Sequence, residues 1–208
     1  MHRRTALSVS AALLVAAPLL SACSGQSRPG TAAVVGGERI TTSALQAQVN
    51  DVRTAQNRSG QSAAQLIQAS PGLERVKLNK MIQTAVLERA AKDAGVRVSP
   101  REVEEFRKAQ LEKAGGPEQL EAAALEQAHL APGQLEADAR FKLLRDKLFD
   151  HYGSQDKALE KLGAAAKALH IEVNPRYGAW DAQQIVLGDQ QTPWITQRTR
   201  PGQAPAGA

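Results

Sequence analysis

The sequence predicts a mainly α-helical domain with a small β element that joins its two ends. Three observations predict this fold. Apolar residues recur with helical spacing through most of the chain, and capping signals separate the periodic segments. Aromatic residues make up only 3% of the sequence, which favours helices that pack through alanine and leucine. Short segments near both ends carry a strand pattern instead of a helical one.

The first β-capable segments are residues 33–35 and 38–40, which flank the pair Gly36-Gly37. A Gly-Gly pair between such segments is typical of a tight hairpin. An isolated two-stranded hairpin is marginal in water, so we expect this one to pair with another strand. The stretch "HIEVNPRYG" places Ile171 and Val173 on one side of a short strand. This strand is the expected partner of the hairpin.

Residues 73–94 form the strongest predicted helix, and it ends at Gly95, a residue that readily adopts left-handed angles. The apolar residues of this segment follow the spacing i, i+3, i+4, i+7 and i+8. They are Leu78, Met81, Ile82, Ala85 and Val86. We therefore expect this helix to be central to the domain.

The other predicted helices have start signals of their own. Ser99-Pro100-Arg101-Glu102 combines a serine cap, a proline at the first helical position and a glutamate at the third, as in a capping box. Residues with capping or helix-starting chemistry also precede the remaining helices. They are Thr41 or Thr42, Pro117, Pro132 and Ser154.

Residues 1–22 have the form of a secretory signal peptide, with a basic start and an apolar run too short for the ~20 residues of a membrane span. The leader ends in "LSAC", which resembles a bacterial lipobox, in which the cysteine receives a diacylglycerol. We therefore expect lipidation at Cys23 and a lipidated tether over residues 23–31. Acyl chains, palmitate among them, would anchor the protein at the extracytoplasmic face of the bacterial cell membrane. The alternative is an ordinary signal peptide followed by an incidental cysteine.

The rest of the chain divides into a helical domain over residues 32–187 and a polar, proline-bearing tail over residues 188–208. The tail has no periodicity, so we expect it to be disordered. The chain has a single cysteine, and the fold therefore depends on packing rather than on an internal disulfide.

Composition and motifs argue against several functions. The formal net charge is +5 at pH 7, and the dispersed charges do not form the basic patch that nucleic-acid binding requires. His129, His151 and His170 do not occur in a metal-binding motif such as H-E-x-x-H. We find neither a nucleophile elbow nor a phosphate loop. We therefore predict no catalytic residues, no metal site and no cofactor, and expect a protein that is not an enzyme.

The order of the segments is more specific than any one of them. The stretches "AAVVGGERITTSAL", "LNKMIQTAVLERAAKDAGVRVSPREVEEF", "GGPEQLEAAALEQAHLAPGQLEADARFKLLRDKL" and "LHIEVNPRYGAWD" follow one another along the chain. Together they resemble the SurA/PrsA/trigger-factor group of peptide-binding chaperones, and in particular the SurA N-terminal domain. The resemblance covers residues 32–181.

The resemblance implies a helical chaperone whose apolar grooves hold extended segments of unfolded exported proteins. Many relatives carry a parvulin-type prolyl isomerase domain between the long helix and the terminal helix. Here that junction is "HYGSQD", residues 151–156, which is too short for such a domain. The resemblance therefore implies binding rather than isomerase catalysis.

The leading hypothesis is a lipid-anchored extracytoplasmic chaperone that works without ATP and binds unfolded or extended exported polypeptides. Candidate client-binding residues are Phe106, Leu111 and Leu120 on the charged helical arm; the alternative is that they are ordinary core residues. A second hypothesis is a structural or scaffold envelope lipoprotein that binds one specific partner. A third is a peptidyl-prolyl isomerase.

Overall fold

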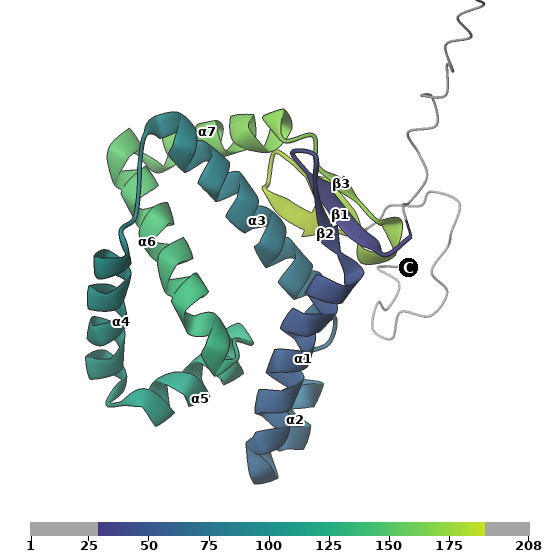
Figure 1. Ribbon diagram of the computed structural model, residues 1–208, viewed down its shortest axis with the longest axis vertical. Helices are drawn as coiled ribbons and strands as arrows, with labels where there is room; N and C mark the ends of the chain where they lie inside the picture. Colours follow the sequence, from purple (N-terminus) through teal and green to yellow (C-terminus); the bar gives the residue numbers. More distant parts are fainter. Residues whose placement is uncertain (1–28, 190–208) are drawn as a thin grey trace, which may run out of the picture.

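The computed structural model describes residues 29–189, which form seven α-helices and two small antiparallel sheets. This architecture confirms the mainly helical fold class (Figure 1). The helices are α1 (Thr42–Arg58), α2 (Ala63–Gln68), α3 (Leu73–Ala94), α4 (Pro100–Ala114), α5 (Pro117–Ala128), α6 (Leu135–Tyr152) and α7 (Gln155–Ala168). The strands are β1 (Thr31–Val35), β2 (Glu38–Thr41), β3 (Glu172–Val173), β4 (Ala179–Asp181) and β5 (Val186–Gly188).

The predicted leader, the lipidation site Cys23 and residues 190–208 of the predicted tail lie outside the described residues. Strand β1 begins at Thr31, the last residue of the predicted tether, and β5 ends at Gly188, the first residue of the predicted tail. The structure therefore places the last residue of the predicted tether and the first residue of the predicted tail in strands.

The three-stranded sheet has the order β2-β1-β3 and joins the two ends of the fold. Ala33 of β1 lies opposite Ile40 on one side and Val173 on the other. The Gly36 amide in the hairpin turn donates to the Leu169 carbonyl at 2.6 Å. The predicted pairing of the N-terminal hairpin with the C-terminal strand is confirmed.

Helix α3 runs through the middle of the fold and packs against α1, α6 and α7 (Figure 1). Leu78, Ile82 and Val86 are fully buried in the core. Met81 and Ala85, which the periodicity places on the same apolar face, are only half-buried. The apolar residues of α3 therefore extend beyond the fully buried face of the helix.

Several helix ends have the capping contacts that the sequence predicts. The Ala44 amide donates to Thr41 Oγ1 at 3.1 Å, which caps α1. At the start of α4 the Glu102 amide donates to Ser99 Oγ at 3.3 Å, and the Ser99 amide donates to Glu102 Oε2 at 2.9 Å. These reciprocal bonds satisfy two amides that a helix start leaves without partners.

Helices α4, α5 and α6 form a triangular frame (Figure 1). Helix α4 buries only Val103, and α5 buries only Leu125. Gly115 and Gly116 connect α4 to α5 with φ of 86° and 130°, angles that side chains other than glycine rarely adopt. We call α4 and α5 together the arm.

The hairpin of β4 and β5 is an element that the sequence analysis missed. It pairs Trp180 with Leu187 and packs on α3, where the Leu187 amide donates to Asn79 Oδ1 at 2.8 Å. Each strand has three residues, and the connecting segment Ala182-Gln183-Gln184-Ile185 lacks the glycine, proline or asparagine of a recognisable turn. Strands this short show no periodicity, and the turn signal is Asp181, whose Oδ1 accepts from the Gln183 and Gln184 amides at 2.8 and 3.0 Å.

Candidate functional site

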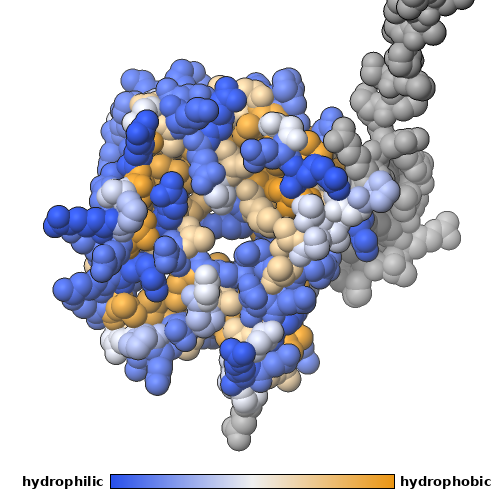
Figure 2. Space-filling model, in the orientation of Figure 1, coloured by the Kyte–Doolittle hydropathy of each residue, from blue (hydrophilic) through white to orange (hydrophobic). Residues whose placement is uncertain are grey.

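A groove of about 360 Å³ lies between β2, α3 and the start of α6. We call it the strand–helix groove. Figure 2 shows the open centre of this face of the molecule, with apolar surface beside it. The hydrophobic residues that line the groove come from five elements or loops of the chain. They are Val35, Ile40, Met81, Ala85, Leu130 and Ala137.

Helix α3 supplies one whole wall of the groove, because it has two neighbouring faces with the same helical spacing. Its core face carries Leu78, Ile82 and Val86. The adjacent face lines the groove at spacings i, i+3, i+4, i+7 and i+8. Its residues are Lys77, Lys80, Met81, Thr84 and Ala85.

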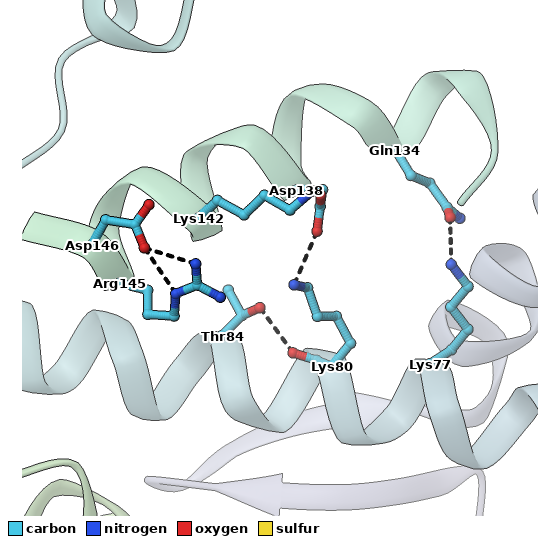
Figure 3. Close-up of polar contacts among 8 residues, drawn as sticks. All are labelled: Lys77, Lys80, Thr84, Gln134, Asp138, Lys142, Arg145 and Asp146. Carbon is cyan, nitrogen blue, oxygen red and sulfur yellow. Dashed lines mark hydrogen bonds and ion pairs between the residues drawn. The ribbon is translucent and has the colours of Figure 1, made fainter. Parts of the chain in front are cut away.

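Lys77 is buried at one end of this wall, with 5% of its surface exposed. Its Nζ donates to Gln134 Oε1 at 2.5 Å (Figure 3). The Gln134 amide group in turn donates to the Gln48 carbonyl at 3.0 Å, so the acceptor is held in place by α1. Burial lowers the pKa of Lys77 to about 8, against an opposing attraction from Asp138. This ammonium is therefore costly to bury and only partly compensated.

Lys80 and Lys142 bind Asp138 from opposite sides. Lys80 Nζ lies 3.0 Å from Asp138 Oδ1, and Lys142 Nζ lies 2.8 Å from Asp138 Oδ2. Figure 3 shows Lys80 reaching from α3 to α6. Burial raises the pKa of Asp138, but the hydrogen bonds from Lys142 and Lys80 outweigh it, so the pKa is lowered overall. The carboxylate stays charged and joins the two helices.

Lys80 also lies over an aromatic ring of α6, with its Nζ 3.2 Å from the centroid of Phe141. Burial lowers the pKa of Lys80, and the hydrogen bond to Asp138 opposes that shift. A cation in contact with both a carboxylate and a ring face is well compensated. Lys80 therefore differs from Lys77, which has a neutral amide as its acceptor.

The arrangement suits the noncovalent binding of an extended polypeptide. Strand β2 is at the edge of its sheet, so its outer backbone groups can pair with another extended chain. Ile40 and Met81 offer apolar surface beside that edge. An extended segment could therefore make backbone hydrogen bonds and bury side chains in the same place.

The predicted client-binding residues lie elsewhere. Phe106 and Leu111 are on α4 and Leu120 is on α5, and all three are half-buried. Phe106 packs against the hydrophobic core, as an ordinary core residue would. The residues that line the strand–helix groove come from other elements. A role of the three arm residues in client binding remains a prediction.

His129, His151 and His170 do not line the strand–helix groove. His129 ends α5 with φ of 51°, and His151 meets Tyr152 edge-on with ring centroids 5.0 Å apart. Within residues 29–189 the structure places no three His, Cys, Asp or Glu side chains where they could hold a metal ion. In the same range no helix has the length and apolar character to cross a membrane.

Sequence reasoning missed Lys77 and Gln134 as functional candidates. A signal for them existed: the spacing of Lys77, Met81 and Ala85 marks a second face of α3 beside the core face. The partner Gln134 lies 57 positions further along the chain. Spacing within one helix could not have found it.

Comparison with protein-family models places the chain in a family. The model for the SurA-like N-terminal domain matches residues 2–149. The chain therefore belongs to this family. The match includes β2, α1, α3 and nearly all of α6, whereas α7 and strands β3 to β5 follow it. Comparisons with curated proteins and with solved structures each gave no match.

Proposed function

We propose that this protein is a lipid-anchored extracytoplasmic chaperone that binds extended segments of exported proteins without ATP. The observation that carries the proposal is the strand–helix groove, which joins an apolar wall to an open strand edge within the part of the chain that matches the SurA-like N-terminal domain. Membership of a chaperone-type family and a groove of this form support the same activity. The predicted lipidation at Cys23 would keep that activity at the membrane.

The junction between α6 and α7 supports binding rather than isomerisation. Helix α6 ends at Tyr152 and α7 begins at Gln155, so only Gly153 and Ser154 connect them. We accordingly propose a protein that acts by holding its clients, with no catalytic residue, metal or cofactor.

The activity is tested by aggregation of a chemically denatured exported protein, followed by light scattering. The full chain is expressed in a bacterium, and its processed form is purified from the cell envelope. We expect it to suppress aggregation when present in stoichiometric excess. No suppression under that condition would contradict the proposal.

Two substitutions on α3 separate the groove from the rest of the helix surface. Met81→Lys places a charge on the apolar wall of the groove and is expected to weaken suppression. Val76→Lys is the matched control, because Val76 is 45% exposed and does not line the groove. Equal suppression by the two variants would place client binding elsewhere on the molecule, for instance on the arm.

The anchor and the range of clients need separate measurements. The intact mass of the processed N-terminal peptide will show whether Cys23 carries a diacylglycerol, and Cys23→Ala should move the protein out of the membrane fraction. Crosslinking in cells should capture many exported proteins. One dominant envelope partner would favour the scaffold hypothesis, and turnover of a proline peptide would favour the isomerase.

A further inference from the structure

The strand–helix groove contains a cation whose hydrogen-bonding capacity is largely unused. The ammonium of Lys77 has three N–H donors. Within residues 29–189 its only hydrogen-bond acceptor is Gln134 Oε1, at 2.5 Å. Lys77 lines the groove although only 5% of its surface is exposed. Two donors therefore remain for a ligand in the groove.

The neighbouring acidic groups do not satisfy this cation. Asp138 of α6 is already bound by Lys80 and Lys142. Asp51 of α1 is exposed and attracts Lys77 only from a distance, without an ion pair. Lys80 on the same helix adds a repulsive positive charge. The inner end of the groove is therefore complementary to an anion.

We propose that the strand–helix groove binds extended polypeptide segments in which a carboxylate lies beside apolar residues, with the carboxylate paired to Lys77. This inference rests on the proposed function and names the class of segment that the groove prefers. The apolar side chains of the segment contact Ile40 and Met81, which line the same groove. The carboxylate belongs to a glutamate or aspartate of the client.

The strand edge explains why the ligand is extended. The sheet order β2-β1-β3 leaves β2 with one strand partner, and an added segment can pair with its outer edge. Alternate side chains of such a segment point to the same face and are spaced ~7 Å apart. An acidic residue and an apolar residue two positions apart then lie on the same face of the segment. The acidic residue can reach Lys77 while the apolar residue covers the apolar wall.

The test compares two fluorescently labelled peptides with amidated C-termini. Both alternate serine and leucine; one has a glutamate in place of a central leucine, and the other has a glutamine there. Fluorescence anisotropy measures the affinity of each for the full processed protein. We expect the glutamate peptide to bind about tenfold more tightly, because a charge-assisted hydrogen bond exceeds a neutral one by that order.

Lys77→Met removes the cation and keeps an apolar side chain of similar length. Its affinities for the two peptides should agree within about twofold. Lys157→Met is the matched control, because Lys157 is exposed on α7 and does not line the groove; it should keep the tenfold preference. Circular dichroism of both variants checks that they fold.

Carbodiimide crosslinking gives a second reading on the wild-type protein, independent of any variant. The reagent couples a carboxylate to an adjacent amine, and mass spectrometry locates the resulting amide. We expect the peptide glutamate to be joined to Lys77. A crosslink from Lys77 to a second copy of the chain, and none to the peptide, would make another copy the occupant and overturn the inference.

The outcomes separate this inference from the function on which it rests. Failure of the wild-type protein to bind either peptide would reject peptide binding itself. Binding of both peptides with equal affinity, or a preference that survives in Lys77→Met, would reject the carboxylate site while leaving peptide binding intact.

Discussion

The core around α3 and the arm of α4 and α5 are stabilised in different ways. Helix α3 buries eight of its residues, whereas α4 and α5 each bury one. Burial of apolar surface therefore dominates around α3. The arm joins the hydrophobic core only through Val103 and Leu125, with Phe106 packed against it, and also has polar links to α6.

Polar contacts add to the attachment of the arm. The Ser99–Glu102 capping box starts α4, and Lys147 of α6 forms an ion pair with Glu102. Arg107 and Glu136 approach to 3.7 Å, which adds a weak link to α6. The comparison teaches that the arm buries fewer residues than α3, so that capping and surface ion pairs account for a larger share of its contacts.

The largest expected effect tests the core side of this comparison. Leu78→Ala should lower the free energy of unfolding by about 2–5 kcal/mol, because Leu78 is fully buried and its truncation leaves a cavity. Leu111→Ala on the half-buried arm should cost about 1 kcal/mol or less. Urea denaturation measures both. Equal losses would show that the arm packs as tightly as the core.

A smaller effect is expected at Lys77, where burial opposes stability. Lys77→Met should raise the free energy of unfolding at pH 7 by roughly 1 kcal/mol, because it replaces a buried charge with an apolar side chain. Urea denaturation of the variant and the wild type at several pH values measures the difference. A loss of stability at pH 7 would mean that the bond to Gln134 outweighs the cost of burial.

The pH dependence gives the sign of this effect. In the folded protein the pKa of Lys77 is about 8, below its ordinary value of 10.5. Between these values the unfolded chain binds the proton and the folded chain releases it, so wild-type stability should rise with pH. The advantage of Lys77→Met should therefore be full below pH 8 and shrink as the pH rises towards 10.5. A constant difference across this range would contradict the lowered pKa.

The smallest effect is local to the arm. Ser99→Ala removes the side-chain acceptor of the capping box and should cost about 1 kcal/mol or less. Hydrogen exchange should quicken in the first turn of α4 and stay unchanged in α3. A uniform increase throughout the molecule would mean that the arm unfolds together with the core.

Low pH should also destabilise the start of α4. The pKa of Glu102 is lowered to about 2 by the hydrogen bond from Lys147 and then by those from Ser99. The contribution of the charged carboxylate is present above its ordinary pKa of 4.5 and lost as the pH falls towards 2. Amide exchange at the start of α4, corrected for its intrinsic pH dependence, should accelerate over that range in the wild type and less in Ser99→Ala.

The sequence was a good guide wherever structure depends on nearby residues. The predicted limits of α3 and the predicted start of α5 at Pro117 agree with the structure, and Ser99 forms the capping box that its spacing indicates. The pairing of the hairpin with the strand at Val173 was also predicted, because an isolated hairpin needs a partner. The β4–β5 hairpin was missed because each strand has only three residues and its turn residue, Asp181, was not recognised.

The candidate site was much harder to predict than the fold. Periodicity marked Met81 and Ala85 as apolar but could not tell core surface from groove surface. Nothing in the sequence around Lys77 distinguishes it from other charged residues on helices. Its hydrogen-bond acceptor, Gln134, belongs to a distant segment. Sites built from separate helices require the packing angles between them, and those angles leave no mark in local spacing.

The pairing of β1 with β3 has a consequence for the order in which the protein can fold. Ala33 and Val173 are neighbours in the sheet, although nearly the whole described chain lies between them. Until Val173 is in place, the hairpin of β1 and β2 lacks its second strand partner. Helices can form before that contact, but the sheet closes only when the segment after α7 reaches the hairpin, so its completion is a late event in folding.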